Sequence, residues 1–347
     1  MRLSALRTLL LLLGPMVGCK PDIPEPIWKG TYLYYSTTTS EPVCRGSFYR
    51  QEQHAVQLAR YLGFELPEAI HFTRISRSEI VDFCDVSGAK GCSDADAPYT
   101  FSVRSFHYHE IAHAVARLGG IGGALPFAEG FAEVFNDGGE PSTEHAAIDD
   151  VLRDFKLDNP NYYTAGLFSR FLIERHGFEA FVDFLRSTDE SAGFAQFSPV
   201  FEDVFGEPIG TAMIEFESYP LCPEMSNRIA LVDCSLPLEP WEGQTVILSA
   251  NVACDQDDVL GPSTGDVMFA TRGFQVDEAG SYLFLASAPE GWSGFRVLKC
   301  GSCWDNIDLS IQPGAMEVHD LTPGRYYVLL GRTVDDPAEL GLAIGRL

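Results

Sequence analysis

The sequence predicts an α+β chain in two parts, a mixed helical and stranded domain followed by an all-β domain. Two observations lead to this prediction. Up to about residue 220, apolar residues recur mostly at helical spacing, with a few short β-rich runs among them. After about Cys222 the pattern changes to short alternating runs, which are separated by turns containing Gly and Pro. Such a series of short strands is typical of a β-sandwich.

The first 18 residues have the pattern of a processing signal. Arg2 and Arg7 lie in a charged start, residues 9–13 form an apolar core, and Val-Gly-Cys19 closes the segment. The apolar run is too short to span a bilayer. Its ending resembles a bacterial lipoprotein cleavage site, which implies that residues 1–18 are removed and that Cys19 is lipidated. An ordinary secretory signal is the alternative, and both place the mature protein outside the cytoplasm.

Residues 19–29 are rich in proline and are expected to form a tether, after which the first domain spans residues 30–221. Apolar residues at i, i+3, i+4 and i+7 predict a helix through 55–62 that stops at Gly63. Ser76 and Glu79 form a capping box for another short helix. The β-rich runs predict strands at 31–36, 69–75 and 99–103.

The most informative motif is His109-Glu110-x-x-His113. On a helix, the two imidazoles leave the same face one turn apart, which is the spacing of two zinc ligands. Glu110 lies roughly 100° around the helix axis, where it can serve as a base without being a ligand. Gly119-Gly120 is expected to end this helix.

A second motif follows the first after a reversal at Gly122-Gly123. A helix that begins near Pro126 would carry Glu129 and Glu133 one turn apart. We expect Glu129 to be the third ligand of a Zn²⁺ ion, whose fourth position is left open. Glu133 is expected to accept a hydrogen bond from a ligand imidazole, and its alternative role is a helix-surface acid.

These motifs resemble those of the gluzincin metallopeptidases, especially the peptidase MA-like bacterial proteins. Residues 126–132 match the family's Glu-Gly-x-Ala element, and the resemblance spans roughly residues 30–218. It implies a zincin-like domain that hydrolyses peptide bonds in a peptide or protein substrate, with Glu110 as the general base. Tyr163, three residues before Gly166, matches the family tyrosine that stabilises the oxyanion. The Gly-x-Met-Glu-Asn element of aminopeptidase relatives is not found before His109, which favours an endopeptidase.

Residues 222–347 are predicted to form the β-sandwich. Residues 321–328 resemble the closing strands of pre-peptidase C-terminal domains, which are appended to secreted peptidases. The expected strands are 245–250, 267–270, 280–286, 324–331 and 340–344.

Nine cysteines are present, and setting Cys19 aside leaves an even number that permits disulfides in an oxidising compartment. Cys84 and Cys92 bracket a short polar loop that a disulfide would close. Cys222 and Cys234 bracket the end of the helical region. The CxxC spacing of Cys300 and Cys303 favours a structural bridge here. For Cys44 and Cys254 the sequence indicates no partner.

The net charge of −25 argues against nucleic acid and anionic membrane surfaces as partners and is expected to disfavour acidic substrates. Membrane contact is therefore expected through the lipid anchor only, at the outer membrane or surface of a bacterial cell envelope.

Two alternative functions stay open. One is a catalytically inactive surface lipoprotein that holds a partner with its β-sandwich, and the other is a hydrolase of non-peptide amides.

Overall fold

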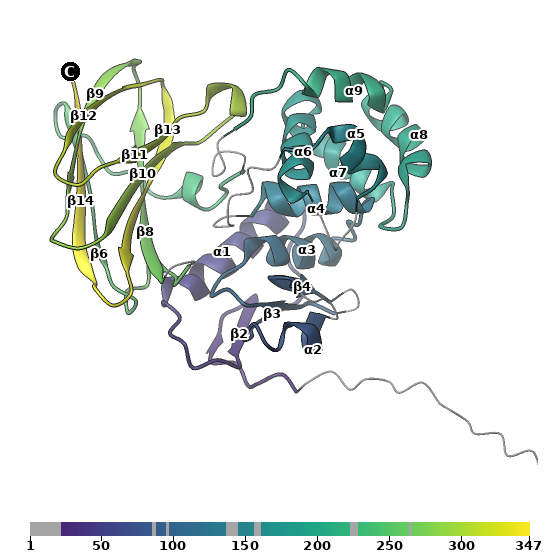
Figure 1. Cartoon of the computed structure of the whole chain (residues 1–347), viewed down its shortest axis with the longest axis horizontal. Coiled ribbons are helices and arrows are strands. Elements are labelled where there is room, and N and C mark those ends of the chain that lie inside the picture. Colours follow the sequence, from purple (N-terminus) through teal and green to yellow (C-terminus); the bar gives the residue numbers. More distant parts are fainter. Residues whose placement is uncertain are drawn as a thin grey trace, which may run out of the picture.

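The computed structural model shows a chain of mixed helix and sheet with a β-sandwich-like C-terminal portion (Figure 1). It describes residues 22–84, 88–94, 97–136, 145–155, 161–222, 228–263 and 266–347. The expected signal at 1–18 and the lipidation site Cys19 lie outside the described residues. Within the described ranges, none of the helices is long and apolar enough to cross a bilayer.

One five-stranded sheet organises the first half of the chain. Its order is β1-β2-β3-β5-β4, in which β2, β3 and β5 run parallel and both outer strands run antiparallel to their neighbours. The strands predicted at 31–36, 69–75 and 99–103 are confirmed within one or two residues. The sequence did not indicate β1, which lies inside the expected tether, or β4. The bounds are β1 (Trp28–Lys29), β2 (Leu33–Thr37), β3 (Ile70–Arg74), β4 (Gly91–Ser93) and β5 (Tyr99–Ser102).

Helices cover both faces of this sheet. On one face α1 (Gly46–Tyr61) and α3 (Tyr108–Leu118) share a core with the strands, to which Leu58, Phe72 and Val115 contribute. On the other face α2 (Ile80–Cys84) packs against Phe101. Half of the capping box predicted before α2 is present: Glu79 Oε2 accepts a hydrogen bond from the Ser76 backbone amide at 2.9 Å, while the Ser76 hydroxyl donates to the same carboxylate oxygen.

Helix α4 packs on α3 and on α6, and the other helices continue from α6 on the side away from the sheet (Figure 1). Gly130 allows α4 and α6 to approach closely, since a Cβ at position 130 would lie 2.5 Å from the carbonyl oxygen of Ala165. The bounds are α4 (Leu125–Val134), α5 (Ile148–Arg153), α6 (Tyr162–His176), α7 (Phe178–Arg186), α8 (Phe194–Phe205) and α9 (Ile209–Phe216).

The C-terminal portion consists of two antiparallel sheets around a second apolar core, which confirms the predicted β-sandwich. One sheet has the order β11-β10-β13-β8-β7 and the other β12-β9-β14-β6. All five predicted strands are present, whereas β7, β10, β11 and β12 were not predicted. The bounds are β6 (Thr245–Val252), β7 (Val259–Leu260), β8 (Val267–Val276), β9 (Gly280–Ser287), β10 (Ser293–Lys299), β11 (Asp308–Ile311), β12 (Met316–Leu321), β13 (Gly324–Thr333) and β14 (Ala338–Arg346).

Three of the four disulfides join a residue that precedes β6 to a residue that follows it. The pairs are Cys44–Cys254, Cys222–Cys303 and Cys234–Cys300, while Cys84–Cys92 closes a short loop as predicted. Cys300 and Cys303 therefore bond to separate partners and not to each other. Four disulfides indicate an oxidising, extracytoplasmic environment.

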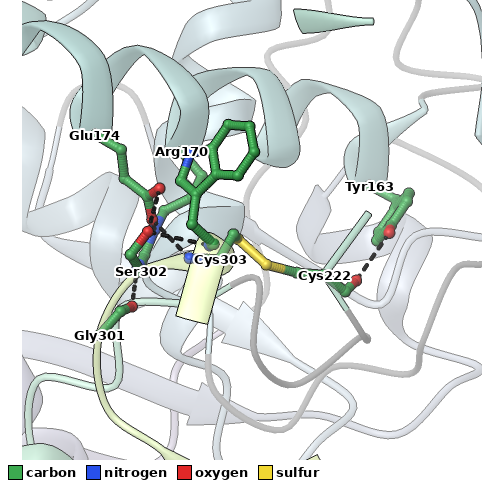
Figure 2. The surroundings of a disulfide bond; sticks show 8 residues. Tyr163, Arg170, Glu174, Cys222, Gly301, Ser302 and Cys303 are labelled. Carbon is green, nitrogen blue, oxygen red and sulfur yellow. Dashed lines mark hydrogen bonds and ion pairs between the residues drawn. A yellow bond between two sulfur atoms is a disulfide. The ribbon is translucent and has the colours of Figure 1, made fainter. Parts of the chain in front are cut away.

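Polar contacts reinforce the junction around Cys303 (Figure 2). Glu174 of α6 accepts hydrogen bonds from the Cys303 amide at 3.0 Å and the Ser302 hydroxyl at 2.8 Å. Arg170, one turn earlier on α6, holds Glu174 at 2.7 Å and also donates to the Gly301 carbonyl. These contacts fix α6 to the sandwich, and the first residues of α6 lie near the candidate metal ligands.

Candidate metal centre

Three predicted ligands converge at one point between α3 and α4. His109 Nε2 lies 3.0 Å from Glu129 Oε2, His113 Nε2 lies 3.3 Å from the same oxygen, and the two Nε2 atoms are 3.2 Å apart. Their residues are largely shielded from solvent. Among the residues that the structure describes, this is the group of three or more His, Cys, Asp or Glu side chains that could hold a metal ion.

The spacing of these donor atoms fits zinc. In a tetrahedral site with Zn–N bonds of about 2.0–2.1 Å, two ligand atoms are about 3.3 Å apart. The three observed separations lie within a few tenths of an ångström of that value. Within the described ranges the triangle has three protein donors, and a tetrahedral site with three protein donors has a fourth position open, as in catalytic zinc sites.

Glu133 supports His109 from outside this triangle. Its Oε2 lies 3.5 Å from His109 Nδ1, on the ring nitrogen that the triangle does not use. Asn136 donates a hydrogen bond to the same oxygen at 3.0 Å, and Arg228 lies 3.7 Å from Oε1. A carboxylate at Nδ1 keeps the proton of the neutral ring there, so that Nε2 presents a lone pair to the triangle.

The electrostatics of the triangle favour a bound cation. Burial alone would lower the pKa of His109, but hydrogen bonds to Glu129 and Glu133 outweigh it and raise the pKa to about 10. Burial would raise the pKa of Glu129, yet the two histidines hold it below its usual range. Without a metal, a proton is the cation shared among these lone pairs. A zinc ion would take that place.

Glu110 is buried beside the triangle without belonging to it. Burial raises the pKa of this carboxyl, a shift that the nearby histidines oppose. Strand β4 packs directly on it, since the Ser93 hydroxyl donates to the Glu110 carbonyl oxygen at 3.0 Å and a Cβ at Gly91 would lie 2.9 Å from Glu110 Cγ. A buried base that binds its proton more readily is suited to proton transfer near neutral pH.

His107 is not one of the converging donors. Its Nδ1 lies 3.0 Å from the Ser102 hydroxyl and 3.9 Å from Glu110 Oε1. Burial holds the pKa of His107 well below its usual range. The ring therefore forms a neutral wall next to Glu110.

The structure places Tyr163 differently from the expectation. Its hydroxyl donates to the Cys222 carbonyl oxygen at 3.0 Å, beside the Cys222–Cys303 disulfide (Figure 2). The ring of the preceding residue, Tyr162, instead lies 5.4 Å from that of His109, edge to face. Burial, with the nearby charges of Glu129, Glu110 and Glu133, raises the pKa of Tyr162, so that its hydroxyl keeps its proton.

The first turn of α6 explains why Tyr162, and not Tyr163, lies beside His109. Asn161 caps the helix by accepting a hydrogen bond from the Thr164 amide at 2.9 Å, so Tyr162 is the first helical residue. Successive helical side chains diverge by about 100°, and only one of the two neighbouring rings can face His109. The sequence-based choice of Tyr163 rested on its position three residues before Gly166. The sequence alone does not show which residue caps the helix, and therefore which tyrosine faces His109.

No protein-family model matches the chain, and no curated protein sequence matches it. Among solved structures, the pre-peptidase C-terminal domain of a collagenase from Bacillus anthracis is 12% identical, with a TM-score of 0.24; the match covers 32% of this chain and 98% of that one. PliG, a periplasmic inhibitor of g-type lysozyme from Salmonella Typhimurium, is 14% identical over 32% of this chain and 95% of its own, with a TM-score of 0.22. The C-terminal CBM6 of LamC from Zobellia galactanivorans is 14% identical over 29% of this chain and 99% of its own, with a TM-score of 0.18. These low similarities carry no argument about function.

Proposed function

We propose that this protein is a zinc metallopeptidase of the gluzincin type, with a zincin-like domain over residues 30–221. The observation that carries the proposal is the donor triangle of His109, His113 and Glu129, next to a buried carboxylate that is not a ligand. A purely structural zinc site has four protein ligands and needs no base. Three donors, an open position and a base are the parts of a hydrolytic site.

The chemistry divides between the metal and the protein. Bound zinc would supply a Lewis acid that lowers the pKa of water and polarises a carbonyl. Glu110 would accept the proton of the attacking water and then donate it to the leaving amine. Glu133 would hold His109 in the tautomer and orientation that the site needs.

Tyr162 is the side chain that we assign to the oxyanion, in place of Tyr163. Its ring packs on His109, and its hydroxyl stays protonated in the field of three carboxylates. A protonated hydroxyl can donate to the negative oxygen of a tetrahedral intermediate, where a hydrogen bond is strongest in the transition state.

A polypeptide substrate is favoured by strand β4. It is the outermost strand of its sheet, and no strand in the described ranges pairs with its free edge. Gly91 and Ser93 of β4 lie against Glu110, so an extended chain added to this edge would pass beside the base. Strand addition of this kind uses backbone hydrogen bonds, which a peptide offers and a small amide does not.

We further propose that the mature protein begins at a lipidated Cys19 and acts as a peptidase in a bacterial cell envelope. The disulfides support an extracytoplasmic location. Mass spectrometry of the N-terminal peptide tests the anchor, because an unmodified N-terminus downstream of Cys19 would exclude it.

The enzyme assignment is tested by incubating the zinc-loaded protein with a mixed peptide library and identifying products by mass spectrometry. We expect internal cleavage that stops on chelation and returns with zinc. If a protein that holds one zinc cleaves nothing in the library, the alternative of a binding lipoprotein replaces this proposal.

A further inference from the structure

A second site candidate lies where the first domain meets the sandwich. A cavity of about 220 Å³ is bounded there by residues of the first domain and by Pro262 and Ser263 of the sandwich. Four cations line it, together with two acids: Arg74, Arg77, Lys90 and Arg104, with Glu41 and Asp266.

This excess of positive charge is opposite to that of the whole chain. The sequence has 49 acidic and 24 basic residues, so a wall drawn at random would hold about twice as many acids as bases. The cavity reverses that ratio, with four cations and two acids. Positive charge gathered in a concave site concentrates anions, and the surrounding acidic surface makes the contrast sharper.

The wall contains an exposed guanidinium, and two unpaired donors are buried within it. Arg77 is exposed, and no ion pair or hydrogen bond of its side chain occurs within the described ranges. Ser105 is fully buried, yet its hydroxyl has no hydrogen-bond partner there, and the buried Nε of Arg74 also lacks one. Buried donors are nearly always satisfied in proteins by a protein group, a water or an ion, and an anion next to this wall would be one such acceptor.

Arg74 is held firmly in place. Its side chain is 6% exposed, it pairs with the Glu41 carboxylate, and its NH1 donates to the Pro42 carbonyl oxygen at 3.0 Å. Its NH1 and NH2 groups already bond to residues 41 and 42, so Arg74 contributes a fixed positive charge to the cavity wall.

The cavity adjoins the candidate metal centre through the wall that they share. Lys90 immediately precedes Gly91, which packs on Glu110. The Lys90 carbonyl oxygen accepts a hydrogen bond from the Ser102 hydroxyl at 3.2 Å, and that hydroxyl lies 3.0 Å from His107 Nδ1. The free edge of β4 thus starts at the cavity and continues along the base.

We propose that this junction cavity binds one anionic group, a carboxylate or a phosphate. Its source is an acidic side chain or terminal carboxylate of a polypeptide on the β4 edge, or a free inorganic anion. Anion binding itself is independent of metal-dependent hydrolysis, because it rests only on the charge, donors and position of the cavity, whereas the peptide source rests on the proposed function. The proposal predicts a preference for acidic ligands, whereas the net charge of the whole chain predicts the opposite.

Calorimetric titration of the full-length Glu110→Gln protein tests the proposal, since this variant should not consume a peptide. The probes are inorganic phosphate and two pentapeptides that differ only in a central Glu or Gln. We expect the Glu peptide to bind on the order of 10-fold tighter at low salt, with the difference shrinking as salt rises. Arg77→Ala should weaken Glu-peptide binding about threefold to fivefold, and Arg77→Glu should remove the preference.

One control variant and one further test variant make the result specific. Arg60→Ala removes an exposed arginine of α1 outside the cavity and should change nothing. Ser105→Ala removes the unpaired buried hydroxyl without disturbing the Ser105 carbonyl, which accepts from Tyr35; it should weaken anion binding while leaving the Gln peptide unaffected.

The outcomes separate the two sources. A Glu preference that is lost in Arg77→Glu supports the peptide source, whereas Arg77-dependent phosphate binding without a Glu preference supports a free anion. If neither probe shows Arg77-dependent binding, or if the Glu preference survives Arg77→Glu, the proposal is overturned. Because binding is measured without turnover, failure of the peptidase assignment would leave this result interpretable.

Discussion

Glu133 Oε2 lies 3.5 Å from His109 Nδ1, on the ring nitrogen that the donor triangle leaves free. One helical turn of α4 thus supplies two carboxylates with separate roles, because Glu129 approaches His109 Nε2 at 3.0 Å. This division predicts how the two acids differ when each is removed.

Glu129→Ala should lose zinc affinity and activity together, because it removes a donor atom of the site. Glu133→Ala should weaken zinc binding by only about 10- to 100-fold, because the three donors remain and only the orientation of His109 suffers. Competition with a chromophoric zinc chelator measures both. The ligand assignment is one helical turn wrong if Glu129→Ala binds zinc like the wild type while Glu133→Ala does not.

The neighbouring tyrosines provide a matched pair. Tyr162→Phe should lower kcat on the order of 10²- to 10³-fold with little change in KM or zinc content, as expected for a lost oxyanion donor. Tyr163→Phe removes the hydrogen bond to the Cys222 carbonyl and should cost about 1 kcal/mol of the free energy of unfolding with kcat unchanged. Steady-state kinetics decide between them, and a kcat loss confined to Tyr163→Phe would restore the original expectation.

Gly91 is predicted to be required for the position of Glu110. A Cβ there would lie 2.9 Å from Glu110 Cγ and 2.7 Å from the Phe101 carbonyl oxygen, so either the base or β4 must shift. Gly91→Ala should therefore lower kcat about 10- to 100-fold while zinc is retained. Gly280→Ala in the sandwich, where a Cβ meets nothing within 4 Å, is the control. Full activity in Gly91→Ala would show that Glu110 tolerates displacement.

The sequence predicted the parts of the fold and site that depend on local pattern. The period of 3.6 residues placed His109 and His113 on one face, and the Gly-rich reversal placed Glu129 opposite them. The change of pattern near Cys222 located the sandwich. These signals lie within one or two elements, and tertiary packing did not alter them.

The features that the sequence did not predict depend on contacts between distant segments. Cys300 and Cys303 are close in sequence, yet they bond to Cys234 and Cys222 because the domain junction lies between them. Strand β4 is three residues long and is defined by its pairing with β5, which no local pattern reveals. The cavity at the junction combines residues from both domains, so its positive charge is invisible in the overall composition.

His54 predicts how stability depends on pH. It is buried and stacked on Tyr108 with ring centroids 4.4 Å apart, and burial lowers its pKa from 6.5 to about 3. The unfolded chain therefore binds a proton at a higher pH than the folded chain does, so the stability is fully present above pH 6.5 and is lost as the pH falls toward 3. His54→Phe keeps a ring on Tyr108 and removes the titration.

Urea unfolding at pH 7 and pH 4 should show the difference. We expect the wild type to lose about 3 kcal/mol more of its free energy of unfolding than His54→Phe over this interval. Equal losses in the two proteins would mean that His54 does not carry this part of the acid sensitivity.

The central claim is that Glu110 is a base beside a zinc ion and not a structural acid. The most direct test is the rate of peptide hydrolysis by the wild type and by Glu110→Gln, each measured at one zinc per chain as determined by atomic emission. The exchange keeps the shape of the side chain and removes its proton acceptor. The account predicts equal zinc content and a rate at least roughly 10²-fold lower in Glu110→Gln. Equal hydrolysis rates in the two zinc-loaded proteins would contradict it.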